Sequence, residues 1–291
     1  MQILELSALF RPKTSHVYPP FKKGRYMEEF MYDYLISKQN EIQTKYIYIP
    51  IFWTNMQNHP AFIDKRKSYQ ILFDEAIKDR DASYFTIVQH DDGCQLLLPR
   101  NTIVFGACKG NVPLPLIYED ITNRLVQHPR VVKDLLASFV GTYTTHPIRG
   151  KMYNTLFGKT GIECRVKSKW EKNVPEEDAN AFLDLTSRSK FCLAPRGYGR
   201  SSFRFFEAML LGAVPVYLWD DQEWLPYKDK IDYSAFAVSI HEKELPELYT
   251  ILSSISKEDY ERMVQEGKKI SNWFTMEGMA EYIVSYLLSF C

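Results

Sequence analysis

The feature that most constrains this chain is a regular alternation of short apolar runs with amphipathic segments, and it occurs in two series. The first series predicts a helix at 25–38, a strand at 46–52, a helix at 67–78, and strands at 84–88 and 102–105. The second predicts strands at 135–140, 162–166, 190–194, 214–218 and 235–240, separated by helices at 150–157, 179–187 and 203–211. Strands that alternate with helices are typical of parallel, doubly wound sheets. The chain is therefore predicted to be an α/β protein.

The two series predict two domains. A mixed, polar stretch follows 112–117 and runs to about residue 133, which places the domains at 1–133 and 134–291. A length of 291 residues agrees with this division, because domains commonly hold roughly 100 to 200 residues. The tail 258–290 is expected to be largely helical with a break near Trp273, and these last helices are candidates to pack back on the first domain.

Composition and charge exclude several classes of protein. The 36 Lys and Arg balance the 36 Asp and Glu, so a general nucleic-acid binder with a basic surface is excluded. The longest apolar stretches fall well short of the roughly 20 residues that span a bilayer, and no basic leader precedes Glu5. Five scattered cysteines without a C-x-x-C pair are expected to be reduced thiols. We expect a soluble, cytoplasmic protein without a membrane anchor, in an oligomeric state that the sequence leaves open.

The segment 190–208, KFCLAPRGYGRSSFRFFEA, carries the clearest chemical signal. It predicts a strand, a turn with glycines and serines, and a helix whose N-terminus offers unpaired backbone N–H groups to an anion. Five cations precede the first acid, Glu207: Arg188, Lys190, Arg196, Arg200 and Arg204. A solvated basic face is the plainer interpretation. Cations interleaved with glycine and serine at such a turn favour a phosphate site.

Glu207 follows Arg204 by three residues and shares its helical face. It could accept hydrogen bonds from ribose hydroxyls, or it could form a surface pair with Arg204. Such a pair contributes only about 0.2 to 0.5 kcal/mol on a helix, so energetics do not separate the two interpretations.

Together with the segment 212–240 (GAVPVYLWDDQEWLPYKDKIDYSAFAVSI), this stretch resembles the exostosin domain of glycosyltransferase family 47. The positions that match the family pattern are Phe191, Cys192, Leu193, Pro195, Arg196, Gly197, Ser202, Arg204, Glu207, Ala208, Gly212, Pro215, Val216, Pro226 and Tyr227. Weaker likeness extends to 135–156, to VQHDDG at 88–93 and to 112–115, so that the resemblance spans roughly 25–256. Asp92 stands where the family has an aromatic residue.

The resemblance implies a GT-B fold, with two Rossmann-like domains facing across a cleft and the nucleotide on the C-terminal one. It implies inverting, metal-independent transfer from a UDP-sugar, as substrate rather than cofactor, to a glycan hydroxyl. The chain also resembles the compact exostosin-like transferases of large algal viruses, some of which are β-xylosyltransferases. That likeness implies UDP-xylose as donor, a β-linkage from an α-linked D-sugar, and the host cytoplasm as location.

The resemblance also implies roles for individual residues. The set expected to bind the UDP-sugar is Arg149, Arg196, Gly197, Ser201, Ser202, Arg204 and Glu207. Asp91, at the carboxyl end of a strand, is the expected general base, with His90 and Asp92 as competitors and a plain turn at 91–93 as the alternative. Asp220 and Asp221 would meet donor or acceptor hydroxyls unless they form a solvated turn, and His146 would line the cleft.

Several familiar patterns fail. Gly158, Lys159 and Thr160 end like a P-loop, but the earlier glycine it requires is Tyr153. Asp79 and Asp81 form a D-x-D in a charged stretch before a strand, where a metal role is not expected, and the histidines have no ligand spacing. Two other functions stay open. One is a non-catalytic module that binds a nucleotide sugar or a glycan, and the other is a nucleotide-sugar hydrolase or phosphorylase.

Overall fold

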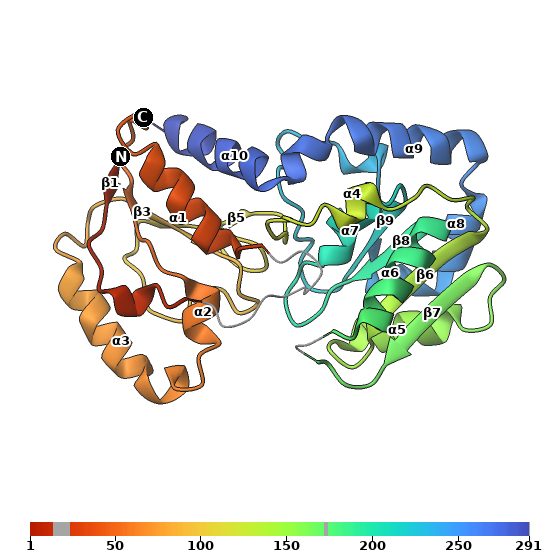
Figure 1. The fold of residues 1–291 in the computed structure, drawn as a ribbon, viewed down its shortest axis with the longest axis horizontal. Helices are drawn as coiled ribbons and strands as arrows, with labels where there is room; N and C mark the ends of the chain where they lie inside the picture. The colour runs from red at the N-terminus through yellow and green to blue at the C-terminus, as the bar shows by residue number, and fades with distance from the viewer. Residues whose placement is uncertain (14–23, 172–173, 291) are drawn as a thin grey trace. The chain divides into compact units, whose positions relative to one another are not determined.

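The computed structural model describes residues 1–13, 24–171 and 174–290, and these form two compact units (Figure 1). The first unit holds 1–13, 24–119 and 275–290, and the second holds 120–171 and 174–274. The chain thus leaves the first unit after Glu119, ahead of the boundary expected at 133. It returns to that unit with its last helix, α10 (Met276–Leu288).

The first unit is built on a five-stranded sheet in which all strands are parallel and follow the order of the chain. Its strands are β1 (Gln2–Ile3), β2 (Ile47–Tyr48), β3 (Tyr84–Val88), β4 (Thr102–Gly106) and β5 (Val112–Pro113). Its other helices are η1 (Ala8–Phe10), α1 (Met27–Ser37), α2 (Trp53–Gln57) and α3 (Phe62–Ala76).

Alternating side chains of β3 separate the two faces of this sheet. Tyr84 and Val88 pack into a cluster with residues of α2 and α3. Phe85 points to the opposite face, where it contacts Phe105, and Phe105 in turn meets Tyr286 of α10 edge to face. Helix α1 packs beside α10 (Figure 1). Helices therefore cover both faces of the sheet.

Two predicted strands are shorter than expected, and proline explains one of them. The strand expected at 46–52 covers only Ile47–Tyr48, because Pro50 has no N–H to continue the ladder and α2 begins at Trp53. The strand expected at 235–240 begins at Val238. Before it the chain forms a 3₁₀ turn, η2 (Tyr233–Ala235), which Asp232 caps by accepting the N–H of Ser234.

The second unit also carries a five-stranded parallel sheet, but its strands are not in chain order. The strands are β6 (Leu135–Thr142), β7 (Ile162–Lys167), β8 (Ser189–Pro195), β9 (Val214–Trp219) and β10 (Val238–His241), arranged β10-β9-β8-β6-β7. The helices are α4 (Arg124–Gln127), α5 (Pro147–Leu156), α6 (Glu176–Arg188), α7 (Phe203–Leu210), η3 (Glu242–Glu247), α8 (Leu248–Ser254), α9 (Lys257–Lys269) and η4 (Ser271–Phe274).

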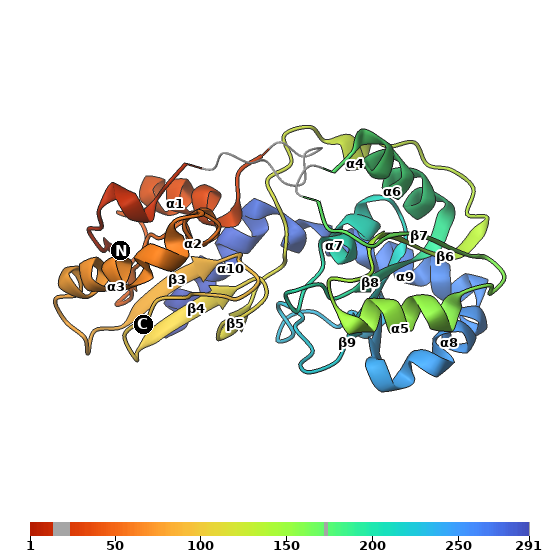
Figure 2. The same ribbon diagram turned by 90° about the horizontal axis from the view of Figure 1, so that it is seen from below.

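Helices cover both faces of this second sheet as well (Figure 2). Residues of α5 and α8 pack with Phe139 and Phe191 on one face, whereas residues of α4, α6 and α7 pack with Val140 and Cys192 on the other. Both units are thus Rossmann-like, and the predicted α/β class is confirmed. The break expected near Trp273 is the 3₁₀ turn η4, which separates α9 from α10.

Strand order places a topological switch point in the second unit. The chain passes from β6 to β7 on one side and then crosses back to β8 on the other, so β6 and β8 are neighbours whose following helices diverge. In open parallel sheets, ligands bind outside the carboxyl ends of strands at such a reversal. The first unit, whose strands follow chain order, has no reversal among the described strands.

Two further expectations concern the chain as a whole. Within the described ranges, no helix combines the length and apolar character that crossing a bilayer demands. The four cysteines that lie there, Cys94, Cys108, Cys164 and Cys192, are free thiols. Cys291 lies outside the described residues.

Candidate functional site

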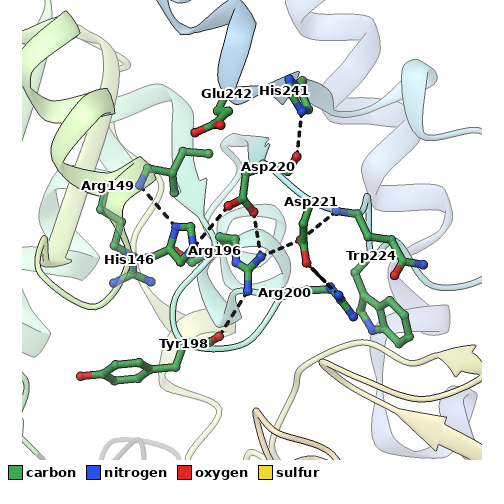
Figure 3. Close-up of polar contacts among 12 residues, drawn as sticks. His146, Arg149, Arg196, Tyr198, Arg200, Asp220, Asp221, Trp224, His241 and Glu242 are labelled. Atoms are coloured by element: carbon green, nitrogen blue, oxygen red, sulfur yellow. Dashed lines mark hydrogen bonds and ion pairs between the residues drawn. The ribbon is translucent and has the colours of Figure 1, made fainter.

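Most of the residues expected to bind a nucleotide gather at the switch point. Strand β6 ends at Thr142 and β8 at Pro195, and the helices that follow them, α5 and α7, begin just beyond. Arg149 comes from α5, and Arg204 and Glu207 come from α7. The polar contacts around Arg196 are drawn in Figure 3.

Arg149 is buried and ties the ends of β6 and β8 together. Its Nη1 donates to the Thr142 carbonyl at 2.9 Å, Nη2 to the Pro195 carbonyl at 3.2 Å, and Nε to the Arg196 carbonyl at 2.8 Å. A Cβ on Gly197 would lie 3.1 Å from this Nη2, so glycine lets the loop pass close to the guanidinium. The charge of Arg149 is therefore part of the wall of the site.

Arg196 stands at the centre of an ion cluster. Its Nη1 donates to Asp220 Oδ1 at 2.7 Å and to Asp221 Oδ1 at 2.6 Å, while Nη2 donates to the Tyr198 carbonyl. The other carboxylate oxygen of Asp221 accepts from Arg200 Nε at 2.9 Å and Nη2 at 2.7 Å (Figure 3). The Arg196 N–H also donates to the Leu218 carbonyl, which sets this loop beside the end of β9.

Acids from other parts of the chain pair with three of the five cations at 188–204. Arg196 and Arg200 share Asp220 and Asp221, and Arg188 pairs with Asp134 at 2.6 Å. Asp220 and Asp221 lie close to Arg196 because β8 and β9 are neighbours in the sheet, and Asp134 lies close to Arg188 because β6 and β8 begin side by side. Arg196 and Arg200, at the carboxyl edge, are therefore already paired in the structure.

Arg204 reaches the switch point from α7. Its Nε donates to the Val140 carbonyl at 2.6 Å, and its guanidinium lies over the rings of Phe139 and Phe182. A Cβ at Gly141 would come within 2.5 Å of Arg204 Nη2, so this approach requires glycine there. Glu207 is buried at 4% exposure, which rules out the alternative of a solvated surface pair with Arg204.

The N-terminus of α7 offers polar atoms that no described residue satisfies. Ser201 and Ser202 are buried, and Ser202 occupies the N-cap position without making a side-chain cap hydrogen bond. Within the described residues, the buried Ser202 Oγ and Arg196 Nε have no hydrogen-bond partner. A donor and a hydroxyl left in this way at a helix N-terminus suit an anionic ligand.

Asp220 is held on several sides. Its Oδ1 accepts from Arg196, its Oδ2 lies 3.4 Å from His146 Nε2, and its backbone carbonyl is 2.8 Å from His241 Nε2 (Figure 3). His146 caps α5, because its Nδ1 accepts the Ile148 N–H, which leaves Nε2 to carry the proton toward Asp220. Burial and the charge of Arg196 lower the pKa of His146 and so favour the neutral imidazole.

The residues His90 to Gly93 form a turn beyond β3 in the first unit. His90 accepts the Asp92 N–H at Nδ1 and the Gly93 N–H at its carbonyl, and Gly93 has a φ of 70°. Asp91 and Asp92 are exposed, and the Cys108 thiol donates to Asp91 Oδ1 at 3.5 Å. Burial lowers the pKa of His90 against the opposing charges of Asp91 and Asp92. The turn geometry is compatible with an exposed carboxylate base.

A buried carboxyl group that no sequence motif marks, Glu28, anchors this turn. Glu28 Oε1 accepts the Thr54 N–H at 3.1 Å, the Thr54 hydroxyl at 2.8 Å and the Gln89 N–H at 3.0 Å. Burial raises the pKa of Glu28 despite these hydrogen bonds. Gln57 adds a second tie by donating to the Gly93 carbonyl at 2.9 Å.

The D-x-D pattern at Asp79 and Asp81 shapes a turn. Asp79 Oδ1 accepts the N–H groups of Asp81 and Ala82, which shapes the turn before β3. Across the ranges that the structure covers, no three His, Cys, Asp or Glu side chains are grouped so that they could hold a metal ion.

With this geometry described, comparison with known proteins decides the family. Residues 57–255, about two thirds of the chain, match the exostosin GT47 domain. The chain belongs to the exostosin GT47 family. The matched range contains β3 with its following turn and the whole switch point, whereas Glu28 and α10 lie outside it.

Curated relatives of this GT47 chain match over limited stretches. Exostosin-1 of Drosophila melanogaster is 31% identical over 168 residues, covering 52% of this chain and 22% of that protein. The probable β-1,4-xylosyltransferase IRX10 of Arabidopsis thaliana is 38% identical over 96 residues, covering 31% and 23%. The probable glycosyltransferase At3g07620 of Arabidopsis thaliana is 36% identical over 99 residues, covering 34% and 20%. The chain thus matches about a fifth of the length of these relatives.

Among solved structures, TarM aligns with a TM-score of 0.42 at 9% identity, over 89% of this chain and 57% of that one. WaaG, a glycosyltransferase involved in lipopolysaccharide biosynthesis, aligns with a TM-score of 0.37 at 10% identity, over 88% and 81%.

Proposed function

We propose that this exostosin GT47 chain is a glycosyltransferase that moves a sugar from a UDP-sugar to a glycan hydroxyl. The observation that carries the proposal is the pair of buried, unsatisfied atoms at the switch point, Ser202 Oγ and Arg196 Nε, beside the N-terminus of α7. A diphosphate would satisfy both atoms and would also meet the positive end of the helix dipole.

The nucleotide would lie along α7. Its diphosphate would sit against Ser201, Ser202 and the guanidinium of Arg196. The buried charge of Arg149, which Gly197 lets the loop approach, and the half-buried charge of Arg204 would lie behind it. Hydrogen bonds to charged groups contribute about 1.5 to 3 kcal/mol each, so several of them would stabilise the departing UDP without a metal ion.

Glu207 would accept hydrogen bonds from the ribose hydroxyls. Its carboxyl is buried on the same helix, below the proposed phosphate position. The donor sugar would extend toward the end of β9, where Asp220, Asp221 and His146 would meet its hydroxyls or those of the acceptor.

Inversion needs a base on the face of the sugar opposite the leaving group. We assign this role to Asp91, whose carboxylate is exposed at the carboxyl end of β3, with His90 and Asp92 as competitors. The two units would then work as a GT-B pair, the second holding the donor and the first the acceptor. A β-linkage follows if the donor is an α-linked D-sugar.

For the sugar we propose xylose, because IRX10 is named as a probable β-1,4-xylosyltransferase. Glucuronate is the second candidate, because another relative is the probable glucuronosyltransferase GUT1 of Oryza sativa subsp. japonica.

The test is to incubate the protein with a panel of UDP-sugars and mixed glycoside acceptors, with EDTA present, and to measure UDP release. We expect release that depends on both a donor and an acceptor. Release without acceptor would identify a hydrolase. No release with any pair, combined with UDP that still raises the melting temperature, would identify a non-catalytic binding module.

A further inference from the structure

The ion cluster around Arg196 contains two acids with different constraints. The side chain of Asp220 is 23% exposed and is held by His146 as well as by Arg196. The side chain of Asp221 is 44% exposed, and its contacts are with Arg196, Arg200 and the adjacent Gln222 N–H. Asp221 is therefore the acid of the pair that lies closer to solvent and to an incoming ligand.

Asp221 also connects the two arginines. One oxygen accepts from Arg196 Nη1, and the other accepts from both Arg200 Nε and Nη2. A single carboxylate thus spans two guanidinium groups, which is the arrangement that a phosphate oxygen pair would make. Arg200 is itself oriented, because its guanidinium lies over the Trp224 ring and its carbonyl accepts from the Tyr217 hydroxyl.

We propose that Arg196 and Arg200 form the clamp for the diphosphate of the donor, and that Asp221 is an internal occupant which the diphosphate must displace. The inference rests on the proposed function and adds to it a binding residue, Arg200, and a competing residue, Asp221.

Charge supports the displacement. Arg196, Arg200, Asp220 and Asp221 carry no net charge together, whereas the same cluster without Asp221 carries one positive charge. Burial would raise the pKa of Asp221, but the hydrogen bonds from Arg200 and Gln222 and the charge of Arg196 outweigh it and lower the pKa to about 2. Asp221 is therefore ionised at physiological pH and competes as a full anion. In the free protein Asp221 thus neutralises the proposed phosphate site, and a bound diphosphate would take its place between Arg196 and Arg200.

The test is calorimetric titration of the wild type and Asp221→Asn with UDP, inorganic pyrophosphate and uridine. Removing the competitor should tighten UDP and pyrophosphate by about tenfold, the equivalent of one charge-assisted hydrogen bond. Uridine, which has no phosphate, should bind both proteins equally. Adding Arg200→Ala to Asp221→Asn should abolish the gain.

Glu242→Gln is the matched control. It also removes one negative charge near the site (Figure 3). Glu242 pairs with Lys151 and not with the clamp. It should leave all three affinities unchanged, and an equal gain in Glu242→Gln would reduce the effect to general electrostatics and overturn the clamp.

Two other results would overturn the inference. Unchanged or weaker pyrophosphate and UDP binding by Asp221→Asn would show that Asp221 does not compete, while UDP binding by the wild type would leave the proposed function standing. No binding of UDP or pyrophosphate by either protein would overturn the clamp and the proposed function together. Asp221→Ser, compared in the same way, provides a second variant should Asp221→Asn fold poorly.

Discussion

Each sheet of this protein has one buried ionisable side chain at the edge where its proposed site lies, but the one in the first sheet is an acid and the one in the second is an arginine. In the first unit, the Glu28 carboxyl collects N–H groups from Thr54 and Gln89 at the end of β3. In the second, the Arg149 guanidinium collects the carbonyls of Thr142, Pro195 and Arg196 at the ends of β6 and β8. An acid on helix α1 thus holds the edge of the first sheet, and an arginine on helix α5 holds the edge of the second.

The difference agrees with the work proposed for each edge. An acid anchor leaves the turn beyond β3 free to present exposed carboxylates, Asp91 and Asp92, to a hydroxyl that must lose a proton. A buried arginine instead places positive charge behind the loop that would receive a diphosphate. Each anchor thus suits the charge that its own edge is proposed to handle.

The largest effect on activity is expected from Asp91→Asn. A positioned base contributes about 10² to 10⁴-fold, so acceptor-dependent UDP release should fall by that factor. Affinity for UDP, measured by calorimetry, should stay unchanged, because Asp91 lies on the other unit from the switch point.

Asp92→Asn and His90→Asn are the matched variants, because they alter the same turn. Turnover like that of the wild type in Asp91→Asn, with a large loss in one of the other two, would move the base to that residue.

Arg149→Ala should be the most destabilising of the anchor variants. It leaves three carbonyls without their donor, which should lower the free energy of unfolding by about 3 kcal/mol in urea titration. Arg149→Lys keeps the charge but not the planar fork, and it should recover only part of the loss. Full recovery by lysine would show that charge alone, rather than the three directed bonds, holds β6 to β8.

Glu28→Gln should have a smaller effect, about 1 kcal/mol, since an amide oxygen still accepts the bonds that Oε1 receives. The local measurement is hydrogen exchange at the Gln89 amide, which donates directly to Glu28. Exchange should be slightly faster than wild type in Glu28→Gln and much faster in Glu28→Ala. Equal protection of this amide in Glu28→Gln and Glu28→Ala would contradict its anchoring role.

The smallest effect should be the pH dependence that His146 confers. Burial and Arg196 lower its pKa in the folded state, so the unfolded chain, with its usual value of 6.5, takes up the proton first. The folding stability that the neutral His146 contributes is fully present above about pH 6.5, and it is lost as the pH falls through the lower pKa of the folded state.

His146→Asn is the matched comparison, because asparagine caps a helix and does not titrate. The wild type should lose stability relative to this variant between pH 7.5 and 5.5. The groups around His146 that set its pKa, namely Arg149, Arg196, Asp220 and Asp221, remain in the variant. An identical pH dependence in both proteins would show that His146 is not the titrating group.

The sequence predicts the architecture well because alternation is a local signal. The strand–turn–helix at 190–208 appears as β8, its loop and α7, and the strand 84–88 appears as β3 with the same bounds. The bounds of an element differ from the predicted ones where a single residue sets them, as Pro50 does at the end of β2.

Contacts between elements were harder to predict. Nothing in the spacing of Arg149 shows that its donors face three carbonyls, because this depends on how β6 and β8 pair. Glu28 resembles any acid on an amphipathic helix until α2 and β3 close over it. The pairing of Arg196 with Asp221 was more accessible, because strands joined through one helix are usually neighbours, which brings residues just beyond β8 and β9 together.

UDP calorimetry with the wild type, Arg196→Ala and Glu207→Ala tests most directly whether the switch point of the second unit binds the nucleotide. We predict measurable binding by the wild type and a loss of about tenfold or more in each variant, since each removes at least one hydrogen bond to a charged group. Glu176→Ala, an exposed acid of the same unit that pairs with Arg124, should bind UDP like the wild type. Unchanged UDP affinity in both Arg196→Ala and Glu207→Ala would contradict the assignment.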